Sequence, residues 1–372
     1  MKGATTRTCS EHRSMRSPST DTVEDQHSAF FPVGPGSLHS SKTSSVGGLR
    51  MAQEFTHQPV LVTEVTDLFT PVPAGVIIDA TLGGAGHAVA LLEARSDVGI
   101  FGIDRDRKAF EAAQERLVRF GDRAAVASSR FSRIRALIDE SRALNSWPKV
   151  PGAGAPAPVI GVLADLGVSS PQIDVAERGF SFSNDGPLDM RMDESGAMTA
   201  SLFLQDVTLD DLTALLRRNG EGRFARRIAR ALKDAGPITT TAELVSVVDH
   251  AVPKANRRRG HVASRVFQAL RIEVNGEEGE LQALLEASLD LVAPDGRIVV
   301  ISYHSGEDAV VKHLLREWEA GGCTCPEYLP CVCGAVSKGV VVTKRALVAD
   351  EEEIQRNPRS RSARLRAFEV GR

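Results

Sequence analysis

The 372-residue sequence is poor in the features that mark secreted and membrane proteins. It has five cysteines and no secretory signal, so we expect no disulfide framework and a reducing, cytosolic setting. No apolar run approaches the roughly 18 residues that a membrane span requires. The longest runs, such as residues 297–302, have only the length of a strand. We therefore expect no membrane partner.

The first 50 residues lack a continuous apolar segment and contain ten serines mixed with charges of both signs. A segment of this kind buries too little surface to offset the entropy lost on ordering, which predicts a disordered extension over residues 1–50. Met51 opens a better patterned segment, so the sequence leaves open whether residues 1–50 are translated. The chain as a whole is long and apolar enough for a full α/β domain and one smaller domain.

Strand-length apolar runs alternate with amphipathic helical patterns from about residue 57. This alternation predicts a parallel sheet with right-handed crossovers and helices on both faces. Strands are expected at 75–80, 98–104, 123–128, 159–165 and 297–302, and an antiparallel edge at 339–344 and 363–370. Residues 148–158 and the acidic run 350–353 are expected to form loops.

The alternation stops between the fourth and fifth strands. Residues 177–275 show helical patterns and no convincing strand. We therefore expect a helical subdomain over 177–275, inserted into a sheet domain made of residues 51–176 and 276–372.

The first strand-to-helix turn, DATLGGAGH at residues 79–87, suits a nucleotide-like cofactor because its glycines let the backbone approach a ligand closely. Val89 stands where a dinucleotide fingerprint has its third glycine, and S-adenosylmethionine is the other candidate. Asp104, at the end of the second strand, is placed to accept hydrogen bonds from ribose hydroxyls in either class. The alternative is that Asp79 and Asp104 only cap helices. Phe131 is placed either to stack on an adenine or to fill the core.

The fourth strand, VIGVLAD, ends at Asp165 and opens onto a polar loop that runs to Asp193. A buried strand that ends in a carboxylate is how an α/β sheet presents chemistry at its carboxyl edge. Asp165 is therefore the first candidate for a catalytic residue.

Basic residues are concentrated in the predicted insertion. Residues 217–271 contain 13 lysines and arginines against four acidic residues, although the whole chain has a net charge of −3. This local basic surface favours RNA as a partner, and an ordinary solvated helix face remains the alternative. Phosphate contacts of this kind give affinity and no sequence choice.

Four of the five cysteines are close together, as CTCPEYLPCVC. Cys323, Cys325, Cys331 and Cys333 have a spacing that can surround one zinc ion, and four reduced thiols without a metal are the alternative. No metal is expected to take part in catalysis.

With these residues assembled, the chain closely resembles the ribosomal RNA small subunit methyltransferase H family, also called MraW. The resemblance covers about residue 57 to the C-terminus. It departs from the usual family pattern at Ala85 in GGAGH, and at Tyr303 and Gly306, where SFHSLED is usual. The motifs that carry it are HQPVLVTEV, DATLGGAGH, GIDRD, DLGVSSPQ, ERGFSF, DGPLDMRMD, GEGRFARRIAR, SRVFQALRIEVN and SYHSGED.

The resemblance implies a Rossmann-like class I S-adenosylmethionine-dependent methyltransferase sheet with an inserted all-helical subdomain. It implies methylation of N4 of a cytidine in the decoding region of 16S rRNA, as naked RNA or in the small ribosomal subunit. The implied cofactor contacts are Gly84, Ala85, Gly86, His87, Asp104, Phe131, Asp165 and Gln172.

Asp165 and His304 are the candidate catalytic residues, and His304 is equally well explained as a histidine satisfied within a polar loop. A base in structured RNA must be splayed out before it can enter such a pocket. The candidate substrate contacts are Asp185, Asp189, Arg191, Arg257, Arg258 and Arg259.

Two other functions stay open. One is a methyltransferase that acts on another nucleic-acid amine, and the other is a non-catalytic RNA-binding assembly factor. DNA is not expected, since DLGVSS stands where DNA amino-methyltransferases carry a Pro-Pro-aromatic motif. The oligomeric state is left open by the sequence.

Overall fold

The computed structural model describes residues 30–32, 59–181, 183–254, 261–326 and 332–371. Most of the predicted disordered extension lies outside these residues. Residues 30–32 are an exception to the prediction, because they form a strand, β1 (Phe30–Pro32), which pairs antiparallel with the edge of the sheet.

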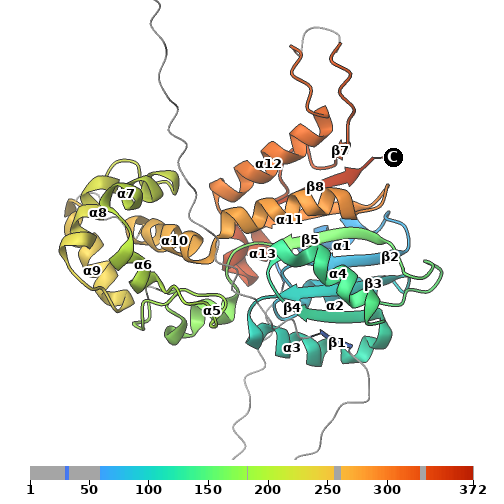
Figure 1. Cartoon of the computed structure of the whole chain (residues 1–372), viewed down its shortest axis with the longest axis horizontal. Coiled ribbons are helices and arrows are strands. Elements are labelled where there is room, and N and C mark those ends of the chain that lie inside the picture. The colour runs from blue at the N-terminus through green and yellow to red at the C-terminus, as the bar shows by residue number, and fades with distance from the viewer. Residues whose placement is uncertain (1–29, 33–58, 182, 255–260, 327–331, 372) are drawn as a thin grey trace, which may run out of the picture.

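One eight-stranded sheet forms the frame of the molecule (Figure 1). Its strand order is β1-β4-β3-β2-β5-β6-β8-β7, in which β4, β3, β2, β5 and β6 run parallel and the remaining pairs are antiparallel. The strands are β2 (Gly75–Asp79), β3 (Val98–Asp104), β4 (Ala124–Ser128), β5 (Val159–Asp165), β6 (Arg297–Ser302), β7 (Gly339–Val341) and β8 (Arg364–Val370). The predicted parallel sheet with an antiparallel edge is confirmed.

Two apolar cores sandwich this sheet. Val65, Leu91 and Phe110 belong to the core on one face, and Leu137, Leu284 and Val311 to the core on the other. The helices of the first face are α1 (Val62–Phe69), α2 (Gly86–Ala94) and α3 (Arg107–Leu117), and those of the second are α4 (Ile134–Ala143), α11 (Glu277–Leu291) and α12 (Ser305–Ala320). Helices on both faces explain why β2 is buried throughout, and why β3 and β5 are buried up to their final aspartates.

The predicted insertion is helical in the structure. Its helices pack around a third core of their own, and among its described residues no strand forms beyond a single bridge between Pro187 and Thr240. Figure 1 shows this helical lobe beside the sheet, joined to it through α10 and the loop around α5. The helices are α6 (Ala200–Asp206), α7 (Leu209–Arg218), α8 (Ala225–Asp234), α9 (Thr241–Ala251) and α10 (His261–Asn275). A capping box at Thr240, with Glu243 as its partner, starts α9.

The prediction of a loop at the acidic run 350–353 is wrong, because these residues start a helix. Asp350 caps α13 (Glu351–Arg356) by accepting a hydrogen bond from the Glu353 backbone N–H at 2.7 Å. Acidic side chains in a first helical turn are favoured by the helix dipole. Glu353 also accepts a hydrogen bond from the Leu61 backbone N–H at 2.8 Å, which ties the end of the chain to the start of α1.

Short elements complete the frame. They are α5 (Ser170–Asp174), η1 (Val118–Arg123), η2 (Phe131–Arg133), η3 (Ala176–Arg178) and η6 (Pro358–Ser362). None of the helices in the described ranges is both long and apolar enough to cross a membrane.

The loop from β5 to α6 folds back on itself at Gly179. This glycine has φ 71°, and a Cβ there would lie 2.3 Å from the Pro187 carbonyl oxygen and 2.7 Å from the Asp189 nitrogen. Both neighbours are backbone atoms, so the loop has no side chain that can move aside. A residue other than glycine would therefore force the two arms of the loop apart.

Gly179→Ala should destabilise the protein more than Gly236→Ala. Gly236 has φ 77° but open space where its Cβ would lie, so alanine there suffers only from backbone strain of about 1 kcal/mol. The steric overlap at Gly179 should raise the loss in the free energy of unfolding to about 3 kcal/mol. Urea unfolding of both variants measures the difference. Equal losses would contradict the close approach of the two arms.

Candidate functional site

A pocket of about 750 Å³ opens at the carboxyl ends of β2, β3, β5 and β6. This is the edge at which wound α/β sheets bind ligands. The predicted site residues that line it are Gly84, Gly86, His87, Asp104, Phe131, Asp165, Gln172 and His304. The remaining predicted cofactor contact, Ala85, is buried and is not part of the pocket lining. It directly precedes α2 and has φ 59°.

The glycine turn is fastened to the end of β3. Asp104 accepts hydrogen bonds from the backbone N–H of Gly83 at 2.8 Å and from that of Asp106 at 2.7 Å. The cap of α3 is Asp106, which accepts from the Lys108 N–H at 3.0 Å. Asp104 therefore shapes the pocket wall and does not act as the helix cap that was its alternative interpretation.

Two buried carboxylates at this edge of the sheet are hard to ionise: Asp104, which lines the pocket, and Asp79, which lies outside the lining. Burial raises the pKa of Asp79 to about 7, although the nearby His87 opposes the shift. Burial likewise raises the pKa of Asp104 to about 6, against the hydrogen bonds from Asp106 and Gly83. A ligand that brings hydroxyl groups or positive charge would favour the ionised form of Asp104.

Asp165 is held by groups that follow β2 and β6 and faces a histidine of α2. Its backbone N–H donates to the Thr81 hydroxyl at 2.6 Å, and its carboxylate accepts from the Tyr303 hydroxyl at 2.7 Å. The second carboxylate oxygen lies 3.6 Å from Nε2 of His87. Because the Asp165 side chain keeps 21% of its surface exposed, it remains within reach of a molecule in the pocket.

His87 is buried, and a polar neighbour among the described residues, the Asp165 carboxylate, lies beyond hydrogen-bond distance. Among the described residues, neither ring nitrogen makes a hydrogen bond. A buried polar atom without a partner costs free energy unless a ligand or water satisfies it. The ring lines the pocket directly after the glycine turn, so a bound molecule is an available partner.

His304 begins α12. Its Nδ1 accepts hydrogen bonds from the backbone N–H groups of Gly306 and Glu307 at 3.2 and 3.3 Å, which leaves the ring proton on Nε2. That nitrogen lies 3.0 Å from the Glu307 carboxylate. Although burial opposes it, this contact and the charge of Arg271 lower the pKa of Glu307. The structure thus gives His304 a capping role at the pocket wall.

Gln172 both lines the pocket and fixes the loop beneath it. Its amide donates to Asp106 at 2.9 Å, and the same carboxylate oxygen accepts from Arg178 at 2.8 Å. All three side chains are buried, so this cluster joins the start of α3 to the loop that follows β5. Phe131 was predicted either to fill the core or to face a ligand. Its ring packs against a core of the sheet and also lines the pocket.

The three predicted substrate residues that the structure describes, Asp185, Asp189 and Arg191, lie outside the pocket lining. Asp185 accepts a hydrogen bond from the Ala242 backbone N–H at 3.0 Å, at the start of α9. Asp189 and Arg191 form an ion pair at 2.7 Å within their own loop. Arg257, Arg258 and Arg259 lie outside the described residues.

Several pocket residues were missed by sequence reasoning. Tyr303 follows β6 directly, so the strand-end argument used for Asp165 applies to it as well. Arg271 and Glu277 form an ion pair at 2.8 Å across the junction between the lobe and the sheet domain. Near the C-terminus, Arg359 and Arg361 also line the pocket. No local sequence pattern could have indicated their position.

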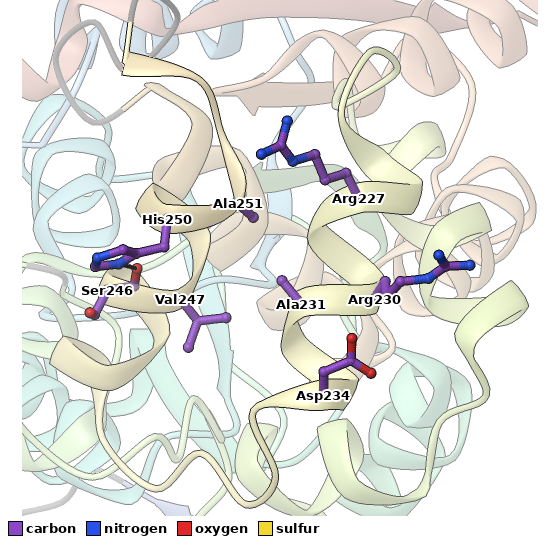
Figure 2. Close-up of a pocket in the computed structure, with 8 residues that line it drawn as sticks. All are labelled: Arg227, Arg230, Ala231, Asp234, Ser246, Val247, His250 and Ala251. Carbon is purple, nitrogen blue, oxygen red and sulfur yellow. Dashed lines mark hydrogen bonds between the residues drawn. The ribbon is translucent and has the colours of Figure 1, made fainter.

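A second hollow lies on the helical lobe, between α8 and α9. Figure 2 shows Arg227, Arg230 and Asp234 on α8, opposite Ser246 and His250 on α9. Both arginines are exposed, and neither has an ion-pair partner within the part of the chain that the structure describes.

Other basic residues of the insertion are used inside the protein. Lys233 donates to the carbonyl oxygens of Leu204, Gln205 and Val207 at 2.8 to 2.9 Å. Arg265 pairs with the buried Glu221 at 2.5 Å. The basic surface available to a partner is therefore smaller than the composition of residues 217–271 suggests.

The wound sheet, its reversed last strands and a ligand pocket beside the glycine turn define a Rossmann-like methyltransferase fold. The chain belongs to the MraW methylase family, whose sequence model matches residues 54–371.

Comparison with curated proteins agrees with this assignment. The chain is 50% identical over 323 residues to the ribosomal RNA small subunit methyltransferase H of Myxococcus xanthus, covering 86% of this chain and 98% of that protein. It is 46% identical over 321 residues to the protein of the same name from Geobacter sulfurreducens, covering 85% and 99%. The family resemblance found in the sequence motifs is confirmed.

Asp79→Asn should stabilise the protein, and more so as the pH rises. Because the folded pKa of about 7 lies above the ordinary 3.8, the cost of ionising Asp79 is absent at low pH and complete above pH 7. Asparagine removes this cost, so we expect a gain of about 2 kcal/mol at pH 5 and about 4 kcal/mol at pH 8.

Urea unfolding at the two pH values measures this gain. Asp67→Asn, on the exposed face of α1, is the control and should change little at either pH. A loss of stability in Asp79→Asn at pH 8 would show that the ionised carboxylate supports the fold.

Proposed function

We propose that the protein is an S-adenosylmethionine-dependent methyltransferase that methylates N4 of a specific cytidine in the decoding region of 16S rRNA. One observation carries the proposal: Asp104, Asp165 and the glycine turn meet in one pocket of a chain in the MraW methylase family. The names of the relatives support ribosomal RNA as the substrate class. The cytidine N4 target follows from the family resemblance of the motifs.

The residues of the pocket fit this cofactor. Asp104 offers a carboxylate to ribose hydroxyls, Phe131 offers a ring to an adenine, and the His87 ring offers nitrogens that make no hydrogen bond to the described residues. The carboxyl groups of Asp104 and Asp165, which line the pocket, are suited to a positively charged ligand. The volume of about 750 Å³ also falls within the roughly 300–1,000 Å³ of small-molecule sites.

When bound, S-adenosylmethionine supplies a methyl group carried by a positively charged sulfonium. The protein's task is then to hold the acceptor nitrogen in line with that methyl group at close range. Asp165 suits this task, since Tyr303 and the Thr81 hydroxyl fix its position at the open end of β5.

The acceptor amine needs help because its lone pair is delocalised into the cytosine ring. A carboxylate that accepts a hydrogen bond from N4–H raises the electron density on nitrogen and takes the proton that methylation releases. We assign Asp165 first to the cofactor pocket and second to this role. His304 lines the same pocket, and a role toward the base stays a prediction beside its capping role.

The helical lobe supplies the surface for RNA. Its exposed basic residues that make no internal ion pair include Arg227 and Arg230 at the hollow between α8 and α9 (Figure 2). Such side chains contact phosphates and give affinity. Sequence choice would come from the pocket, which a base can enter only after it is splayed out of the RNA.

Asp165→Ala should lower the rate of methyl transfer at least hundredfold. The substrate is small ribosomal subunits from cells that lack the enzyme. Tyr303→Phe is the matched variant, since it removes one hydrogen bond to Asp165 and keeps the carboxylate. We expect it to cost about tenfold at most.

Labelled cofactor and mapping of the modified base provide the measurement. N4-methylcytidine in 16S rRNA is the expected product. Label found only on DNA would contradict the proposed substrate. Binding of 16S rRNA without any transfer would favour a non-catalytic assembly factor.

Arg227→Ala combined with Arg230→Ala should weaken binding to 16S rRNA and reduce the slope of log affinity against log salt by about 2. Lys312→Ala combined with Arg316→Ala is the control, because these residues are likewise exposed on one helix, α12. Filter binding over a range of salt concentrations measures both. Equal losses in the two double variants would contradict a phosphate-binding role for the α8 surface.

A further inference from the structure

The described residues between α12 and β7, which are 321–326 and 332–338, project from the sheet domain as an arm (Figure 1). They form neither helix nor strand. Val332 and Val336 on this arm are 89% and 73% exposed, so these side chains do not build a core for it. A segment that buries so little apolar surface needs another source of order, such as a metal ion or a covalent link.

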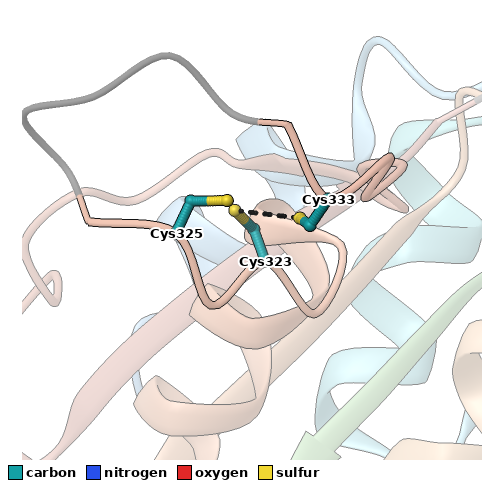
Figure 3. Close-up of side chains that lie close together, drawn as sticks. All are labelled: Cys323, Cys325 and Cys333. Carbon is teal, nitrogen blue, oxygen red and sulfur yellow. Dashed lines mark hydrogen bonds between the residues drawn. The ribbon is translucent and has the colours of Figure 1, made fainter.

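Three thiols meet at the described part of this arm. The sulfur atoms of Cys323, Cys325 and Cys333 all lie within 4.8 Å of one another. The sulfur atoms of Cys323 and Cys333 lie 3.5 Å apart. Figure 3 shows the three side chains directed toward a common point, two from the side that follows α12 and one from the side that leads to β7.

These separations are those of a tetrahedral metal centre. With zinc–sulfur bonds of about 2.3 Å, the sulfur ligands of one ion lie about 3.8 Å apart. The thiols therefore need to move by only a fraction of an ångström to share one ion. Thiolates select soft or borderline metals, and a tetrahedral set of sulfur ligands is typical of zinc.

We propose that Cys323, Cys325 and Cys333 bind one zinc ion as thiolates and that this ion joins the two sides of the arm. Structural zinc takes four ligands, so one more donor completes the site. The sequence contains a fourth cysteine nearby, Cys331, which lies outside the described residues. Binding releases the thiol protons to solvent and leaves the oxidation states of zinc and sulfur unchanged.

The zinc ion is structural and separate from methyl transfer. None of the three cysteines lines the pocket at the carboxyl edge of the sheet. The ion closes a short loop, because Cys323 and Cys333 are ten residues apart. Closing this loop restricts the unfolded arm and fixes its base beside Trp318, whose carbonyl oxygen accepts from the Lys338 N–H at 2.8 Å.

The test is the metal content of the full-length protein, purified under reducing conditions and passed through a chelating column. We expect about one zinc ion per chain by elemental analysis. Cys325→Ser should lose most of it, and Cys325→His should retain it because imidazole is also a zinc ligand. Cys9→Ser, which removes a thiol outside the arm, is the matched control and should retain the full content.

Cobalt substitution provides a measurement that needs no variant. Cobalt in the unaltered protein should give the thiolate charge-transfer band and the strong visible absorption of a tetrahedral site. Chelation of zinc should also speed hydrogen exchange in the arm while leaving β5 and β6 protected.

Three results would overturn the proposal. The first is a purified chain that retains no zinc, and the second is a cobalt spectrum without thiolate bands. The third is a disulfide among these cysteines in protein freshly purified under reducing conditions. Each outcome concerns the arm alone, so it is independent of the methyltransferase proposal.

Discussion

The hydrogen bonds between Asp104 and the glycine turn are the interaction on which the site depends. The bond from Gly83 joins the end of β3 to the turn after β2, and the bond from Asp106 holds the start of α3. Together they fix the shape of the pocket at the glycine turn. The same parallel sheet brings Asp79 and Asp165 to the neighbouring strand ends. Burial raises the pKa of Asp79 and of Asp104, and a ligand that brings hydroxyl groups or positive charge would stabilise the ionised form of Asp104, which lines the pocket.

The rest of the molecule supports this edge from a distance along the chain. Arg178 and Gln172 hold the loop after β5 against Asp106, and Arg271 joins α10 of the lobe to α11 through Glu277. Glu353 ties the segment before the last strand to the residue before α1. The helical lobe and the sheet thus share one pocket wall, which would let the proposed RNA-binding surface and the pocket act on the same nucleotide.

Patterns within one element were enough to predict the sheet, the glycine turn and the strand-end carboxylates of the pocket. The strands ending at Asp104 and Asp165 could be predicted because an apolar run and a polar end occur in consecutive residues. What failed depended on partners far away in the sequence. Lys233 and Arg265 look like surface charges until carbonyl groups and Glu221 are found beside them. Asp350 starts a helix only because residues 351–356 find a place against the frame, where Glu353 meets Leu61.

The most direct test of this arrangement is a crystal structure of the full-length protein with S-adenosylhomocysteine, the product of methyl transfer. We expect the ligand beside the glycine turn, with its ribose hydroxyls donating to Asp104 and its sulfur facing the Asp165 side of the pocket. A ligand bound elsewhere, or one that leaves Asp104 without a contact, would contradict the role given to the carboxyl edge of the sheet.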